Sequence, residues 1–151
     1  RSFIRYPVEV TRKMSTECVF CRIIKGELPS TKVYEDDDVV AFIDIGPVSK
    51  GHTLVVPKRH CDPITDAPVD ILQKIIVVVQ RVARAQVKGL GADAINVTQA
   101  NGPLAGQVVP HIHFHVVPRF SRDGQTRNWI PGKYRGDDEM QYVAEKIREA
   151  M

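Results

Sequence analysis

The chain has 151 residues, a formal net charge of +3, 43% hydrophobic residues and 26% charged residues. This length suffices for one domain that buries a core without disulfide bonds. The 21 basic residues are scattered among 18 acidic ones, so a broad nucleic-acid-binding surface is not expected. No apolar run is long enough to span a bilayer. We therefore expect a soluble protein with neither nucleic acid nor a membrane as a partner.

Residues 1–14 differ in composition from the rest of the chain. The first thirteen residues hold four basic side chains against one acidic side chain. This balance is typical of a natural extension, a cloning remnant or an organelle transit peptide. We interpret residues 1–14 as a flexible extension or cloning remnant and residues 15–151 as one domain. We expect a cytoplasmic protein, or a mitochondrial one if the basic extension is natural.

Cys18 and Cys21 form a Cys-x-x-Cys pair, which is half of a zinc site or a redox motif. The third cysteine, Cys61, makes the count odd, which argues against a disulfide framework and favours a reducing compartment. A short helix that glycine ends is predicted at residues 22–26, in line with the redox interpretation. The zinc interpretation needs two further ligands, which histidines elsewhere could supply.

Three strands are predicted in the next part of the chain. Two short ones, at residues 33–35 and 39–44, flank the acidic run 36–38, which we interpret as a solvated turn and not as a metal site. A third strand is predicted at residues 51–57, where Pro57 and the charged residues after it end the strand.

A long helix is predicted from Asp66 to about Lys88. Asp66 is a suitable N-cap, and Gly89 and Gly91 follow the last turn. Its apolar residues fall on one stripe, which predicts a face packed in the core or at a subunit interface. The stripe consists of Ile71, Leu72, Ile75, Ile76, Val79, Val82 and Ala83.

A strand is predicted at residues 94–99, followed by a glycine-containing loop at residues 100–107. Glycine permits the close backbone approach with which N–H groups bind an anion, although a plain hairpin connection fits the loop alone equally well. After Pro118 the chain is basic and rich in turn residues. A final amphipathic helix, capped by Asp137 and Asp138, is then predicted.

Histidines occupy every second position in the run His111-Ile112-His113-Phe114-His115. In a strand, successive side chains point to opposite faces, so the three imidazoles are expected to share one face. Histidine is well suited to proton transfer, nucleophilic attack and metal ligation near neutral pH. We therefore predict a functional site on this strand, which favours the anion-binding interpretation of the preceding loop.

The run His111–Val117 resembles the signature of the histidine triad family, in which three histidines alternate with apolar residues and two more apolar residues follow. The resemblance extends from about Cys18 to Arg119. Other segments are similar to family segments in the same order: Cys18–Cys21, Ala41–Ile45, Lys50–Lys58 and Gly106-Gln107.

This resemblance implies an α+β fold with a mainly antiparallel sheet of about five strands, one long helix and one C-terminal helix, usually in a homodimer. It also implies a hydrolase or transferase that acts at the α-phosphate of a purine nucleotide such as AMP or an AMP-amide, most similar to adenosine 5'-monophosphoramidases. His113 would be the nucleophile and would form a covalent nucleotidyl-histidine that water then hydrolyses.

The resemblance implies roles for other residues as well. His115 would contact the phosphoryl oxygens or the leaving group, and His52 would form hydrogen bonds near the catalytic face. Asp44 would bind the ribose hydroxyls, with a role as a strand-end turn residue as the alternative. The N–H groups of the loop would stabilise charge on the phosphoryl oxygens. The remaining nucleotide-binding residues are Asn101, Gly106, Gln107 and Val108.

In zinc-bearing members of the family, the Cys-x-x-Cys pair binds zinc together with two histidines. The corresponding residues here are Cys18, Cys21, His60 and His111. Such a set makes a closed structural zinc site and not a catalytic one. It would fix His111 and tether the N-terminal segment to the histidine strand, and Cys61 is expected to remain a free thiol.

Three residues depart from the family pattern. Val108 stands where many phosphoramidases have Ser or Thr, whose hydroxyl can assist a departing amine. Pro110 stands where an aromatic residue is common, and Ala100 where Asn is frequent. The sequence therefore leaves the leaving group and the physiological substrate open.

Three alternatives remain at this point. The three histidines of the motif could bind one catalytic zinc, in which case no covalent adduct would form. The protein could be a noncatalytic nucleotide-binding scaffold, although the intact His113 argues against this. Among enzymes, a diadenosine polyphosphate hydrolase would use the same nucleophile with a different leaving group.

Overall fold

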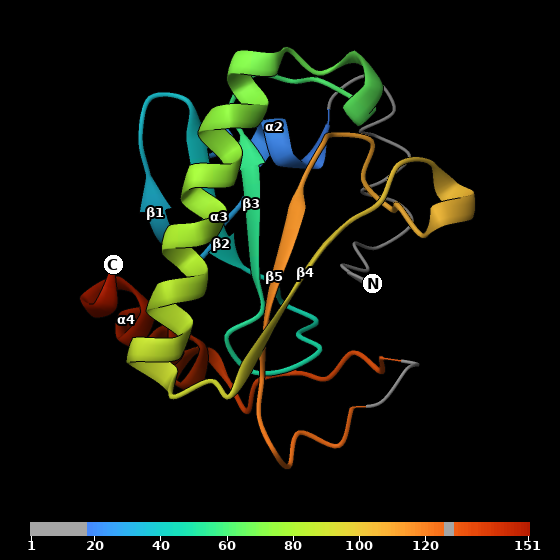
Figure 1. The fold of residues 1–151 in the computed structure, drawn as a ribbon. Helices are drawn as coiled ribbons and strands as arrows, with labels where there is room; N and C mark the ends of the chain where they lie inside the picture. The colour runs from blue at the N-terminus through green and yellow to red at the C-terminus, as the bar shows by residue number, and fades with distance from the viewer. Residues whose placement is uncertain (1–17, 126–128) are drawn as a thin grey trace.

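The computed structural model describes residues 18–125 and 129–151. The expected extension at residues 1–14 lies outside this range. Figure 1 shows one twisted sheet with the long helix α3 lying across it. None of the helices in the described part of the chain combines the length and the apolar character that a membrane span requires.

The sheet has five strands in the order β1-β2-β3-β5-β4, and every neighbouring pair is antiparallel. This confirms the predicted α+β class with an antiparallel sheet. Strand β4 matches the predicted range and pairs only with β5 within the sheet, so it forms one edge. The strands are β1 Lys32–Glu35, β2 Val39–Ile43, β3 Thr53–Pro57, β4 Ala94–Gln99 and β5 Phe114–Arg119.

The two faces of the sheet are covered by different helices. On one face, α3 (Val69–Leu90) and α4 (Asp137–Ala150) pack against residues such as Val55 and Val116. On the other face, the short helix α2 (Val19–Ile24) packs against Phe42 and Leu54. The side chains of a strand alternate between the two faces of the sheet. Strands β2 and β3 therefore contribute side chains to the hydrophobic core on each face, and both strands are buried along their whole length.

The long helix begins later than predicted. It starts at Val69 after Pro68, and Asp66 lies in a short 3₁₀ turn, η1 (Ile64–Asp66), so the prediction of Asp66 as N-cap is wrong. The residue before a proline is disfavoured in the α conformation, and Ala67 is accordingly extended, with φ −71° and ψ 136°. The helix ends at Leu90, and its C-cap is Gly91, whose φ of 69° suits glycine.

Other boundaries also differ from the predictions. Strand β5 begins only at Phe114, so His111 and His113 lie in the irregular segment before it. The N-cap of α4 is Gly136, and Asp137 and Asp138 lie in the first turn. There their negative charges still complement the helix dipole. Helix α2 includes the second residue of the Cys-x-x-Cys pair instead of following it.

Candidate functional site

Four histidines from neighbouring segments gather on the face of the sheet that α2 covers. His52 directly precedes β3, His111 and His113 precede β5, and His115 lies within β5 opposite Leu54. Each of the four exposes 5% of its surface or less. The His113 and His115 ring centroids are 5.0 Å apart. The three alternating histidines therefore share a face, although only the last one is in the strand.

The hydrogen bond of His113 fixes which of its ring nitrogens can react. Its Nδ1 lies 2.7 Å from the carbonyl oxygen of His111, so Nδ1 carries the hydrogen and donates it. The other ring nitrogen, Nε2, then holds a lone pair. A neutral imidazole in this orientation is a nucleophile.

A chain of hydrogen bonds fixes the hydrogens of His52 and His115 in the same way. The N–H of Val48 donates to His52 Nδ1 at 3.1 Å, so the hydrogen of His52 must be on Nε2. His52 Nε2 is 3.0 Å from His115 Nδ1 and donates to it. The hydrogen of His115 is therefore on Nε2. One strand face thus carries a nitrogen lone pair on His113 beside an N–H donor on His115.

Burial keeps these histidines neutral at physiological pH. Loss of solvent lowers the pKa of His113 below its usual value and that of His115 far below it. Burial also lowers the pKa of His52 to about 4, despite the nearby Asp44 carboxylate. The neutral forms are the ones that the hydrogen-bond chain requires.

A cavity of about 170 Å³ lies beside His113 and His115. Its other walls come from the end of β4 and from the loop that follows it. Two loop glycines have backbone conformations that other residues rarely adopt, with φ 87° at Gly102 and 93° at Gly106. They allow the loop, which includes the short 3₁₀ turn η2 (Pro103–Ala105), to fold back on itself beside the cavity.

The loop residues predicted to bind nucleotide are placed as follows. The N–H groups of Gly106 and Gln107 donate to loop carbonyls at 3.0 and 3.2 Å, so both are engaged within the turn. The Val108 N–H has no acceptor among the described residues. The Asn101 side chain accepts the N–H of Ile64 at 2.8 Å and so holds the loop in place.

Asp44 lies at the end of β2 and is fully buried. One carboxylate oxygen accepts the N–H of Gly46 at 2.9 Å, and the other is 3.5 Å from His52 Nε2. The turn role and a contact with the histidine chain are therefore both present. Binding of ribose hydroxyls by Asp44 stays a prediction.

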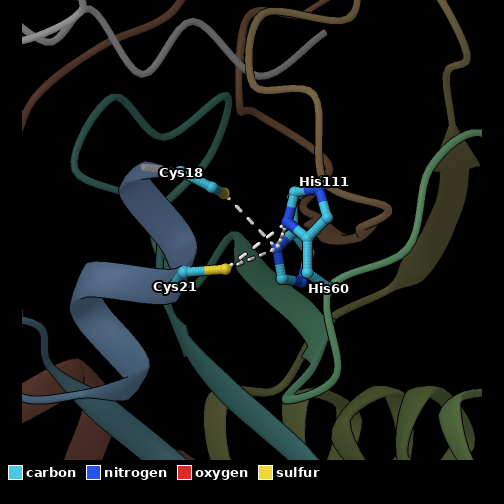
Figure 2. Close-up of side chains that lie close together, drawn as sticks. All are labelled: Cys18, Cys21, His60 and His111. Carbon is cyan, nitrogen blue, oxygen red and sulfur yellow. Dashed lines mark hydrogen bonds between the residues drawn. The ribbon is translucent and has the colours of Figure 1, made fainter. Parts of the chain in front are cut away.

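Cys18, Cys21, His60 and His111 converge on one point, as Figure 2 shows. The Nδ1 of His111 lies 3.4 Å from the Cys18 sulfur and 3.6 Å from the Cys21 sulfur. The Nδ1 of His60 lies 3.4 Å from the Cys21 sulfur and 3.1 Å from the His111 Nδ1. Ligands around tetrahedral zinc, with bonds of about 2.0–2.3 Å, are separated by roughly 3.3–3.8 Å.

The chemistry of these four donors fits a zinc ion. His111 Nε2 donates to the carbonyl oxygen of Pro57 at 2.8 Å, which leaves the lone pair on the Nδ1 that faces the sulfurs. Burial lowers the pKa of His111 to about 4, so the ring is neutral, as a metal ligand must be. Burial also raises the pKa of the Cys18 thiol to about 11, and a nearby cation would offset this cost of the thiolate.

A second group, Asp44, His52 and His115, also converges, but its chemistry does not suit a metal. A metal ligand needs a lone pair, and His52 Nε2 bears a hydrogen because Nδ1 accepts the Val48 N–H. Within the described residues, neither converging group contains all three histidines of the motif. The alternative of one catalytic zinc on His111, His113 and His115 therefore lacks structural support.

The redox interpretation of the cysteine pair also lacks its structural context. A thioredoxin-like motif needs a βαβ unit with parallel strands. The sheet here is antiparallel, and α2 precedes its first strand. The cysteines instead face His60 and His111.

Two contributors to the site were not predicted from the sequence. The ring of Phe20, which lies between the two cysteines, packs edge-on against His113 with centroids 4.9 Å apart. Its position between two predicted zinc ligands was the one feature of the sequence that could have indicated a place near the histidines. Val48 acts through its backbone N–H, for which a sequence offers no signal.

Comparison with known proteins is consistent with this geometry. The family model described as the HIT domain matches residues 25–122. The adenosine 5'-monophosphoramidase HNT1 of Saccharomyces cerevisiae is 38% identical over 133 residues, which cover 83% of this chain and 82% of that protein. The adenylylsulfatase HINT3 of Arabidopsis thaliana is 40% identical over 110 residues, which cover 73% of this chain and 56% of that protein.

A solved structure gives a similar result. The zinc-bound histidine triad family protein from Mycobacterium smegmatis superposes with a TM-score of 0.80 at 37% sequence identity. The match covers 90% of this chain and 94% of that one.

Proposed function

This chain belongs to the histidine triad (HIT) family, and on that premise we propose that it is a nucleotide hydrolase or transferase acting at the α-phosphate of a purine nucleotide. The specific activity that we propose is that of an adenosine 5'-monophosphoramidase. The observation that carries the proposal is the lone pair of His113 Nε2 beside the N–H of His115, at the wall of one cavity.

The reaction proposed for this geometry has two displacement steps. His113 Nε2 attacks the α-phosphorus, the new N–P bond forms, and the bond to the leaving group breaks. The His111 carbonyl, which accepts the hydrogen of His113 Nδ1 at 2.7 Å, stabilises the positive charge that develops on the ring. Water then attacks the same phosphorus, the N–P bond breaks, and AMP, the neutral histidine and a proton are released.

His115 is proposed to serve as a donor to the reacting phosphate. Its Nε2 hydrogen is set by the chain that begins at Val48, so the ring does not need to reorient during the reaction. A donor that is already oriented stabilises developing charge at little reorganisation cost. The N–H of Val108, which has no acceptor within the part of the chain that the structure describes, is a second candidate for this role.

The four converging Cys and His residues are proposed to hold a structural zinc ion. Bound there, zinc would supply no chemistry to the substrate and would neutralise the two thiolates. The backbone of His111 would then be held in place, and with it the carbonyl that orients His113.

A homodimer is also proposed. Strand β4 is at the edge of the sheet, and its Val97 is 46% exposed. An open edge with apolar side chains is a common site of pairing between copies. Helix α3 exposes Ile76 and Val87 at 52% and 50%, which supplies further apolar surface. A particle of twice the chain mass of 16.9 kDa in light scattering would support this proposal.

The decisive experiment compares specificity constants for AMP-amides, AMP-lysine, adenosine 5'-phosphosulfate and diadenosine polyphosphates. The same panel is measured with the His113→Ala variant, and the reaction is quenched for mass spectrometry of the nucleotidyl-enzyme. Turnover with a trapped AMP adduct on His113 supports the proposal. Nucleotide binding without turnover of any compound would instead indicate a noncatalytic scaffold.

The activity of an adenylylsulfatase is the second candidate. Val108 is 51% exposed and directly follows the cavity-lining Gln107, and its side chain offers no hydroxyl to a departing amine. A relative named for adenylylsulfatase activity is 40% identical. The panel decides between the two, because a higher specificity constant for the phosphosulfate than for every AMP-amide would favour this second activity.

A further inference from the structure

The segment of residues 60–64 joins the four-ligand site to the loop beside the cavity. It begins with His60, a candidate zinc ligand. The carbonyl of Cys61 accepts the N–H of Ile112 at 2.9 Å, and the N–H of Ile64 donates to Asn101 at 2.8 Å. The segment is therefore bonded to the histidine segment on one side and to the loop on the other.

The strongest of these bonds is made by Asp62. Its carboxylate accepts a hydrogen from Gln107 Nε2 at 2.7 Å. The same Nε2 donates to the carbonyl of Val109 at 3.0 Å, and Gln107 Oε1 accepts the N–H of Gly102 at 2.6 Å. The Gln107 side chain thus spans the base of the loop, and a charged acceptor holds it there. Hydrogen bonds to a charged group are stronger than those between neutral groups.

We propose that Asp62 is a positioning residue for the nucleotide phosphate. It does not touch the ligand. By holding the Gln107 amide, it fixes Gly102 at the start of the loop and Val109 just after it. Between these two points, Gly106 and Gln107 line the cavity beside His113 and His115. The next residue along the chain is Val108, whose N–H has no acceptor among the described residues. This inference rests on the proposed function, because it assumes that a phosphate is the group bound there.

The geometry predicts which substitutions at this position are tolerated. In Asp62→Asn the amide oxygen can still accept from Gln107 Nε2, so the loop stays fixed. In Asp62→Ala the Gln107 amide loses its charged partner, and its bond to Gly102 no longer has a fixed direction. The loop must then be ordered when the ligand binds, which lowers affinity.

The first measurement is the dissociation constant of AMP for the full-length, zinc-loaded protein, by calorimetry. Asp62→Ala is expected to weaken AMP binding about tenfold, as for loss of one hydrogen bond to a charged group. Asp62→Asn is expected to restore binding to within about threefold of the unsubstituted protein. Asp66→Ala is the matched control, because Asp66 is an exposed aspartate four residues further along the chain. Zinc content is measured for each variant.

A double-mutant cycle separates positioning from a general structural effect. If Asp62 acts through Gln107, Asp62→Ala has no further effect on AMP affinity in a Gln107→Ala background. Equal effects of Asp62→Ala in both backgrounds would overturn the proposal. Loss of zinc in Asp62→Ala but not in Asp62→Asn would also overturn it, because Asp62 would then act on the metal site.

Amide hydrogen exchange tests the same link without any ligand. Asp62→Ala is expected to speed exchange in residues 100–108 about tenfold, because the Gly102 N–H loses its fixed acceptor. Unchanged exchange there refutes the positioning role whatever the substrate is. If exchange responds but the unsubstituted protein does not bind AMP, the proposed function fails while the link between Asp62 and the loop stands.

Discussion

Because its histidines are buried, we predict that the protein loses stability steeply in mild acid. The contribution of His52 gives the sharpest test of this prediction. Its ordinary pKa of 6.5 is lowered to about 4 by burial in the folded chain. The unfolded chain therefore binds more protons than the folded chain between these values, and stability falls as the pH falls. The stabilising contribution is fully present above pH 6.5 and is lost down to about pH 4.

The size of the effect follows from the shift. For a single group with these two pKa values, the free energy of unfolding falls by about 2 kcal/mol between pH 7.5 and pH 5. This value is not reduced for screening by solvent, because His52 has 0% of its surface exposed. A loss of this size is a large fraction of the stability of an ordinary domain.

The assay is urea denaturation of the unsubstituted protein and of His52→Gln at several pH values. Protein concentration is held fixed, because the proposed dimer would unfold in a concentration-dependent manner. The substitution lowers stability at every pH, since Val48 and His115 lose their partner, but only the pH dependence is diagnostic. Between pH 7.5 and pH 5, the free energy of unfolding of His52→Gln is expected to fall by about 2 kcal/mol less than that of the unsubstituted protein. Parallel pH profiles of the two proteins would refute the reasoning.

Three further predictions follow from the site and the fold. His113→Ala should bind AMP and lose nucleotide turnover by several orders of magnitude, as measured by calorimetry and steady-state kinetics; near-normal turnover would contradict a nucleophilic role. Elemental analysis should find about one zinc per chain, and Cys21→Ala should lose that zinc and melt at a lower temperature; a variant that keeps zinc would rule out the ligand set. Gly51→Ala would place a Cβ against the Leu90 side chain at a φ of 105°, and chemical denaturation should show a loss of about 1–3 kcal/mol; unchanged stability would show that the Leu90 side chain can move away.

Local patterns predicted individual strands such as β4, whereas the antiparallel sheet and the grouping of the ligands were predicted from the family resemblance. The range of β4 and the antiparallel arrangement are as predicted. The convergence of Cys18, Cys21, His60 and His111 came from the family resemblance, since their spacing along the chain does not bring them together by itself.

The boundaries that were missed depend on prolines and on distant backbone partners. Pro68 keeps Ala67 out of the helix, which overrides the capping preference of Asp66. Strand β5 begins late because the N–H of Ile112 donates to Cys61 and not to a neighbouring strand. The link between Asp62 and Gln107 joins residues 45 positions apart, and a single sequence carries no local signal for such a pair.

The hydrogen-bond chain behind His115 ends at a peptide group, with a consequence for which substrates can be turned over quickly. The amide of Val48 does not release its proton, and His52 is neutral. His115 can therefore polarise a departing atom, but neither the neutral His52 ring nor the Val48 amide behind it readily replaces a proton that it gives away. Departure of the leaving group should then slow steeply as the pKa of its conjugate acid rises. A plot of log kcat against that pKa should therefore have a large negative slope. The fold would in this way favour turnover of substrates whose leaving groups are weakly basic.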